Sequence, residues 1–118
     1  MRFLLSALVV MAPSGCTSTE RQASIQEKSL ALVAAAYPIG TSADSVRTIT
    51  SERKWTLQAD QALTHWPLRS DGPTVDRVFS IMLPKHVGIP FSISVFAYVG
   101  TKDGRVVGHH VVVEPNAL

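Results

Sequence analysis

The sequence has little of what several large classes of protein need. It holds one cysteine, so no intramolecular disulfide can support it. Eleven basic residues face nine acidic ones, and only 7% of the residues are aromatic, so no basic stripe with interleaved aromatics marks a nucleic-acid surface. No apolar run approaches the roughly 20 residues that a membrane-spanning helix takes. These absences leave one small domain without nucleic acid as a partner.

Motifs that carry chemistry are missing as well. The chain has no glycine-rich phosphate loop, no zinc-ligand spacing and no Gly-x-Ser-x-Gly elbow around a nucleophilic serine. His109 and His110 are neighbours in a predicted strand, so their side chains point to opposite faces and cannot ligate one metal ion. We therefore expect no enzyme: no catalytic residue, no metal site and no cofactor.

What the chain does have is an export signal. Arg2 precedes the apolar run 3–12, and the small residues Ser14 and Gly15 follow it. A positive start, about 7–15 apolar residues and small residues before a cleavage site are the features of a secretory signal peptide. The sequence thus predicts export of the domain that follows.

The end of this signal resembles the lipobox of bacterial lipoproteins. Ser14 and Gly15 fit the two positions before the lipidated cysteine, here Cys16, while Pro13 stands where leucine is usual. The resemblance implies that residues 1–15 are a lipoprotein signal peptide and that Cys16 carries the lipid, including palmitate. By the sorting logic of that family, Thr17 directs the protein to the periplasmic face of the outer membrane.

Two other interpretations of this segment stay open. Cleavage after Ala12 would fit an ordinary secretory site and leave a periplasmic or secreted protein. Translation from Met11 would remove the signal altogether. Lipid attachment has one further point in its favour: an exported lone thiol is a liability, and acylation of Cys16 removes it.

The rest of the chain predicts a short tether and two helices. Residues 16–22, small and polar after the cysteine, are interpreted as a lipidated cysteine with its tether, and residues 23–118 as a single small domain. A helix is expected over 23–36, because Pro38 stops it. A second is expected to about Arg53, capped by Thr41 or Ser42 with Asp44 in its first turn. The expected inward side chains are Ile25, Leu32, Val33, Ala36, Val46 and Ile49.

Alternation with period two predicts strands after the helices. They are expected over 55–59, 74–83, 91–99 and 105–114, with Asp103-Gly104 as a hairpin turn and Pro115 as the end of the last strand. Residues 60–73 are predicted to lack regular secondary structure. The order predicts an α+β fold, in which two N-terminal helices pack on one face of a three- or four-stranded antiparallel sheet, a two-layer sandwich.

The strand 91–99 also indicates a candidate partner surface. Its inward set is predicted as Phe91, Ile93, Val95, Ala97 and Val99, and its outward set as Ser92, Ser94, Phe96 and Tyr98. Phe96 and Tyr98 put two aromatic rings on a face that the two-layer fold leaves open to water. Such rings suit a protein partner, and they equally suit an ordinary cross-strand pair.

Together these features resemble a known group of proteins. The lipobox, the turn Ile39-Gly40-Thr41-Ser42, a capped helix carrying Val46 and a closing antiparallel sheet are similar to the SmpA/OmlA (BamE-like) lipoproteins and to β-lactamase-inhibitor-protein-like modules. The resemblance implies a non-enzymatic scaffold at the outer membrane that binds protein or lipid headgroups. We expect a membrane-anchored envelope interaction or assembly module with an envelope protein partner. The alternative is a secreted periplasmic inhibitor or small-ligand-binding protein of the same fold.

Overall fold

The computed structural model describes residues 17–84, 86–87 and 92–116. The predicted signal peptide, Cys16 and Phe91 lie outside these residues. Within them the elements, in chain order, are α2 (Thr17–Ala36), α3 (Ala43–Glu52), β1 (Thr56–Gln61), β2 (Arg77–Met82), β3 (His86–Val87), β4 (Ser92–Lys102) and β5 (Arg105–Asn116). Neither helix of this described part is long and apolar enough to cross a membrane.

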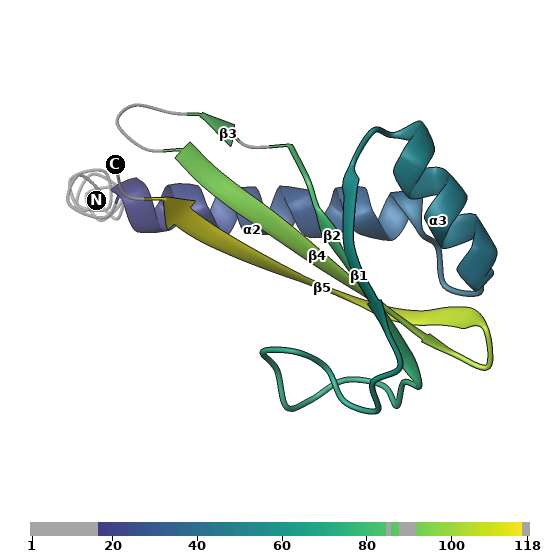
Figure 1. Ribbon diagram of the computed structural model, residues 1–118. Coiled ribbons are helices and arrows are strands. Elements are labelled where there is room, and N and C mark those ends of the chain that lie inside the picture. Colours follow the sequence, from purple (N-terminus) through teal and green to yellow (C-terminus); the bar gives the residue numbers. More distant parts are fainter. Residues whose placement is uncertain (1–16, 85, 88–91, 117–118) are drawn as a thin grey trace, which may run out of the picture.

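All strand pairs are antiparallel and form one sheet. Strands β2 and β3 both pair with β4 on the side opposite β5, so the sheet is four strands across, in the order β1-β2-β4-β5. Figure 1 shows α2 running across one face of this strongly twisted sheet, with α3 beside its β1 end. The predicted α+β two-layer arrangement is confirmed.

The main core lies between the helices and the inner face of the sheet. Alternate residues of each strand point into it, as period-two patterning requires. Phe79 of β2 pairs with Val99 of β4, and both are fully buried. The buried members are Val33, Ala36, Tyr37, Val46, Phe79, Ile81, Leu83, Ile93, Val95, Ala97, Val99, Val106 and Val111.

Helix α2 differs from its prediction in two ways. It begins at Thr17, six residues before the predicted start at residue 23, so residues 17–22 are helical. Leu32, predicted inward, is 42% exposed, whereas Ser29, four residues before the buried Val33, is buried. The predicted inward residues Val33 and Ala36 are buried and Ile25 packs against the core, so the inner face of α2 takes in Ser29 and leaves out Leu32.

The second helix follows its local signals. Gly40 has a φ of +96°, which glycine adopts without strain, and Ser42 caps α3 by accepting a 3.2 Å hydrogen bond from the Ser45 backbone N–H. The turn before α3 also bonds to the free edge of β5: the Val106 N–H donates to the Thr41 carbonyl over 2.8 Å. The cap therefore fixes both the start of α3 and its place beside the sheet.

Strand β5 continues through Pro115 to Asn116, so the prediction that Pro115 ends it is wrong. Pro115 lies opposite Ile93 on an edge strand, where a residue without a backbone N–H is tolerated. The same edge receives a bond from the Gln26 side chain to the Val111 carbonyl over 3.1 Å. Side-chain bonds and a proline of this kind discourage unwanted pairing along an open strand edge.

Ion pairs tie α3 to the sheet at its β1 edge. Asp60 of β1 accepts from Arg47 of α3, 2.7 Å away, and from Arg77 of β2. The Arg47 guanidinium also lies 5.3 Å from the centre of the Phe79 ring. Burial acts to raise the pKa of Asp60, but the hydrogen bonds and charges of the two arginines outweigh it and lower that pKa.

This cluster predicts an acid-side loss of stability. Because the pKa of Asp60 is lower in the folded state than in the unfolded chain, its contribution is present above about pH 4 and is lost as the pH falls through the folded pKa. At pH 7 Asp60→Asn is expected to lower the free energy of unfolding by about 1 kcal/mol, as partly exposed pairs do. Urea unfolding from pH 7 to pH 2.5 measures both effects.

The control for this prediction is Glu52→Gln, a change of an exposed carboxylate on α3. The gap in stability between the wild type and Asp60→Asn should shrink at low pH, while the gap between the wild type and Glu52→Gln stays small throughout. An Asp60→Asn gap that is constant with pH would contradict the assignment.

Candidate functional site

The outer face of the sheet, opposite the helices, is organised in three cross-strand rows. Each row takes one residue from β2, one from β4 and one from β5. The covered row is Val78, Gly100 and Gly108; the middle row is Ser80, Tyr98 and His110; the open row is Met82, Phe96 and Val112.

The loop of residues 62–76 closes over the covered row. Trp66 lies directly on Gly100 and Gly108, since an added Cβ at Gly100 would come within 2.5 Å of the indole ring and one at Gly108 within 3.1 Å. With Val75 and Val78 the indole forms a second buried cluster, against which Leu63, Tyr98 and Val107 pack. The predicted two-layer fold therefore has a third layer at this end of the sheet.

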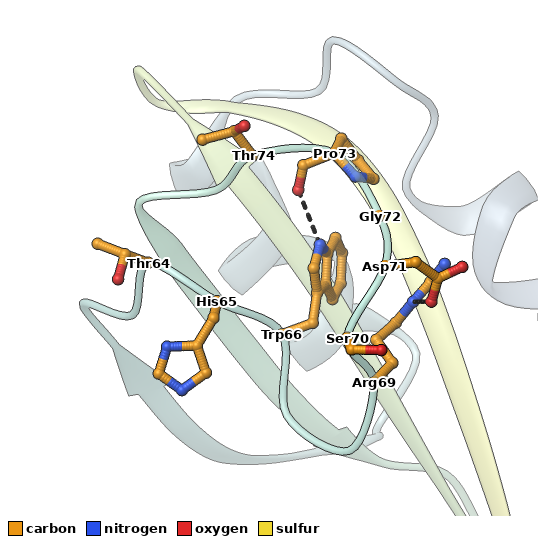
Figure 2. A pocket seen from close by; sticks show the side chains of 9 residues that line it. All are labelled: Thr64, His65, Trp66, Arg69, Ser70, Asp71, Gly72, Pro73 and Thr74. Atoms are coloured by element: carbon orange, nitrogen blue, oxygen red, sulfur yellow. Dashed lines mark hydrogen bonds and ion pairs between the residues drawn. The ribbon is translucent and has the colours of Figure 1, made fainter.

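Polar contacts hold the loop in this shape (Figure 2). The Trp66 indole N–H donates to the Pro73 carbonyl over 2.8 Å. Arg69 pairs with Asp71 at 3.2 Å, lies 5.6 Å from the centre of the Trp66 ring, and reaches the His109 carbonyl of β5 at 3.4 Å. The loop, predicted as irregular to residue 73 and as strand from residue 74, is thus fastened to the sheet by the Trp66 ring and by the Arg69 guanidinium.

A pocket of about 200 Å³ opens within this loop. Its lining residues are Thr64, His65, Trp66, Arg69, Ser70, Asp71, Gly72, Pro73 and Thr74. Arg69, first by its hydrogen bond and then by its charge, lowers the pKa of Asp71 and keeps that carboxyl ionised at neutral pH. Because the charges of Arg69 and Asp71 compensate each other, the pocket has no free charge with which to bind a charged ligand. His65 points away from the indole in Figure 2.

The two neighbouring histidines lie on opposite faces, as predicted. His109 faces the helices, and its Nε2 contacts the Tyr37 carbonyl. His110 lies on the outer face and stacks on Tyr98 with the ring centres 6.1 Å apart. Burial and then the charge of Arg69 lower the pKa of His110, so that ring is neutral at pH 7. Among the described residues no group of three or more His, Cys, Asp or Glu side chains could hold a metal ion.

The predicted partner residues Phe96 and Tyr98 both lie on the outer face, in different settings. Tyr98 packs against the Trp66 cluster. Phe96 is half-buried in the open row and belongs to neither core cluster. Ser94, predicted outward and therefore exposed, is buried. Burial raises the pKa of Tyr98, so its hydroxyl stays protonated at neutral pH.

Sequence reasoning missed Trp66 altogether. One signal was present: Gly100 and Gly108 lie on either side of the Asp103-Gly104 turn, and a register shift beside Gly100 brings them opposite each other. Glycines inside strands mark places where another group approaches the backbone closely. That pair indicated a covered patch, although not which residue covers it.

Comparisons with protein-family models, with curated proteins and with solved structures find no match to this chain. The candidate site is therefore defined by its own geometry: an open apolar row on the outer face, bounded by a fastened loop.

Proposed function

We propose that the protein is a non-catalytic interaction module of the bacterial envelope, held at a membrane through a lipid on Cys16, which contacts an envelope protein through its outer sheet face. The observation that carries the proposal is the open row. Met82, Phe96 and Val112 lie side by side across three strands, half-buried and outside both core clusters. The covered row, two rows away, lies under Trp66, whereas the open row has no such cover among the described residues.

An apolar row of this kind is suited to a protein contact. The cores of protein interfaces are enriched in aromatic residues and methionine and depleted of charge, and Phe96 and Met82 match that composition. The neutral Tyr98–His110 stack beside the row adds polar atoms without adding charge. A partner that covers the open row would meet one acidic side chain close to it, the exposed Glu114, which lies opposite Ser94 on the same face.

The lipid anchor would hold this face at a fixed place. Helix α2 starts at the residue after Cys16 and runs for 20 residues, about 30 Å at the rise of an α-helix. An anchored domain would then be connected to the bilayer through a helix rather than a flexible tether. This supports the role that the SmpA/OmlA-like resemblance implies, a scaffold at the periplasmic face of the outer membrane.

The anchor is tested by labelling cells with a palmitate analogue. Wild-type protein should take up the label, and Cys16→Ser should lose it entirely, because the chain has no other cysteine. Thr17→Ala, which keeps the thiol, is the matched control and should stay labelled. Label that persists in Cys16→Ser, or is absent from the wild type, would exclude the anchor. A mature N-terminus at Pro13 would instead favour the secreted inhibitor or ligand-binding alternative.

The contact surface is tested by site-specific photo-cross-linking in cells. A benzoylphenylalanine in place of Phe96 should give a discrete adduct with one envelope protein. The same group in place of Glu52, exposed on α3 at the other side of the sheet, is the control and should give none. Equal adducts at both positions, or none at Phe96, would exclude the outer face as the contact surface.

A further inference from the structure

One residue of the fastened loop is held in a conformation that its type disfavours. Leu68 has a φ of +60° and is 70% exposed. It follows Pro67 at the centre of a turn from Trp66 to Arg69, which is the pattern of a type II turn. Glycine or asparagine normally fills that position, because the Cβ atom of most other residues makes a positive backbone φ unfavourable. Leu68 is thus both strained and exposed to water.

The other two non-glycine residues with positive φ in the described part have local explanations. Lys54 comes directly after Arg53, the C-cap of α3, and its N–H donates to the Ser51 carbonyl as in common helix endings. Asp103 precedes Gly104 in the hairpin turn, where aspartate is frequent. No such reason applies to a leucine at position 68.

The structure fixes Leu68 from both sides. Before it, the Trp66 ring lies on the glycines of the sheet and bonds to Pro73. After it, Arg69 is bound to Asp71 and to the β5 backbone. Strain that persists because its surroundings determine it is found preferentially at binding sites. A side chain held in this way loses little conformational freedom when it is bound.

Resting on the proposed interaction function, we propose that Leu68 is a preformed contact residue that inserts into an apolar pocket of the protein partner. The loop supplies a rigid base, and the turn places the leucine side chain in solvent. The surface is distinct from the open row, since the loop rises over the opposite end of the outer face. The partner would meet the module at two places, the row on the sheet and the leucine on the loop.

The chemistry around Leu68 fits a protein and not a membrane surface. Membrane-binding surfaces present several apolar side chains together with lysines and arginines. Here a single leucine is followed by Arg69, whose charge is compensated by Asp71 at 3.2 Å, and by the exposed Ser70. The loop thus offers anionic lipids neither a group of apolar side chains nor a net positive charge.

The first test places benzoylphenylalanine at position 68 of the full chain in cells. Thr74, exposed on the same loop, is the matched control. The expected result is one discrete protein adduct, in about tenfold higher yield at position 68 than at position 74. No adduct at position 68, equal yields at the two positions, or cross-linking to lipid alone would each overturn the proposal.

The second test asks whether Leu68 contributes to binding or only to the fold. It compares the change in thermal stability with the change in affinity for the partner. Leu68→Gly removes the strain, so its midpoint of thermal unfolding should be equal to or above that of the wild type, while its affinity for the purified partner identified by cross-linking should fall about tenfold or more, as for a central contact residue. Leu68→Asn, which also tolerates the turn, should behave in the same way. Unchanged affinity, or a loss of stability that accounts for the lost affinity, would overturn the proposal.

Cross-linking at positions 96 and 68 tests the open row and the leucine contact independently. An adduct at Phe96 but none at position 68 overturns only the role of Leu68. An adduct at position 68 but none at Phe96 supports the leucine contact and excludes the open row.

Discussion

Replacing Trp66 by alanine is expected to lower the free energy of unfolding by about 3–5 kcal/mol, as for other buried tryptophans. The side chain is only 5% exposed and covers two glycines of the sheet, and its N–H is bonded to the Pro73 carbonyl. Without the ring the loop loses the contact that fastens it, and the covered row becomes open to water. Urea unfolding followed by far-UV circular dichroism measures the change.

A double-mutant cycle tests whether the ring and the glycine act as one unit. Gly100→Ala puts a methyl group within 2.5 Å of the indole and 2.7 Å of Val75, so it should cost about 1–3 kcal/mol in the wild type. In the Trp66→Ala background part of that cost should disappear, because the indole ring is gone while the contact with Val75 stays. The expected coupling is about 0.5–3 kcal/mol. Additive effects would contradict the placement of Trp66 over Gly100.

Leu32→Ala is the control for the tryptophan change. It also removes a large apolar side chain, but one that is 42% exposed on α2, so it should change stability by only about 0.5 kcal/mol. A loss of several kcal/mol there would mean that Leu32 is buried, as the periodicity of the helix first indicated.

The elements that the sequence predicted well are those whose signals are local. Ser42 and Asp44 mark the start of α3, and Asp103-Gly104 marks the hairpin between β4 and β5. The alternation of Ile93 through Val99 places one set of side chains on the inner face, because the geometry of a strand leaves no other choice. Such signals depend only on neighbouring residues, so they do not change with the tertiary contacts of the rest of the chain.

The errors arose where distant parts of the chain decide. Nothing near Leu32 shows that the inner face of α2 includes Ser29 and leaves Leu32 exposed. Likewise the irregular composition of residues 60–73 hides a contact between Trp66 and strands that come much later. Composition correctly placed proline and glycine in a loop, but only the sheet shows that this loop is fastened to it. The part of the candidate site that the sequence could supply was the outward direction of Phe96 and Tyr98.

The two phenylalanines of the central strands provide the sharpest test of which face is core. Phe79 of β2 is fully buried against the helices, whereas Phe96 of β4 lies half-buried in the open row. Phe79→Ala should therefore cost about 3–5 kcal/mol, since it leaves a cavity in the main core. Phe96→Ala should cost less, about 1–2 kcal/mol, because its ring is only partly buried and belongs to neither core cluster. Urea unfolding of both variants measures the difference.

The difference in burial between Phe79 and Phe96 bears on the proposed contact with a partner protein. A variant that stays folded is needed to separate binding from stability, and Phe96→Ala meets that condition while Phe79→Ala does not. If the open row contacts a partner, Phe96→Ala should weaken that contact about tenfold or more while the protein keeps its fold, as truncation of a buried aromatic at an interface does. Equal losses of stability for the two changes would show that the outer face is covered, and the open row would then be no contact surface.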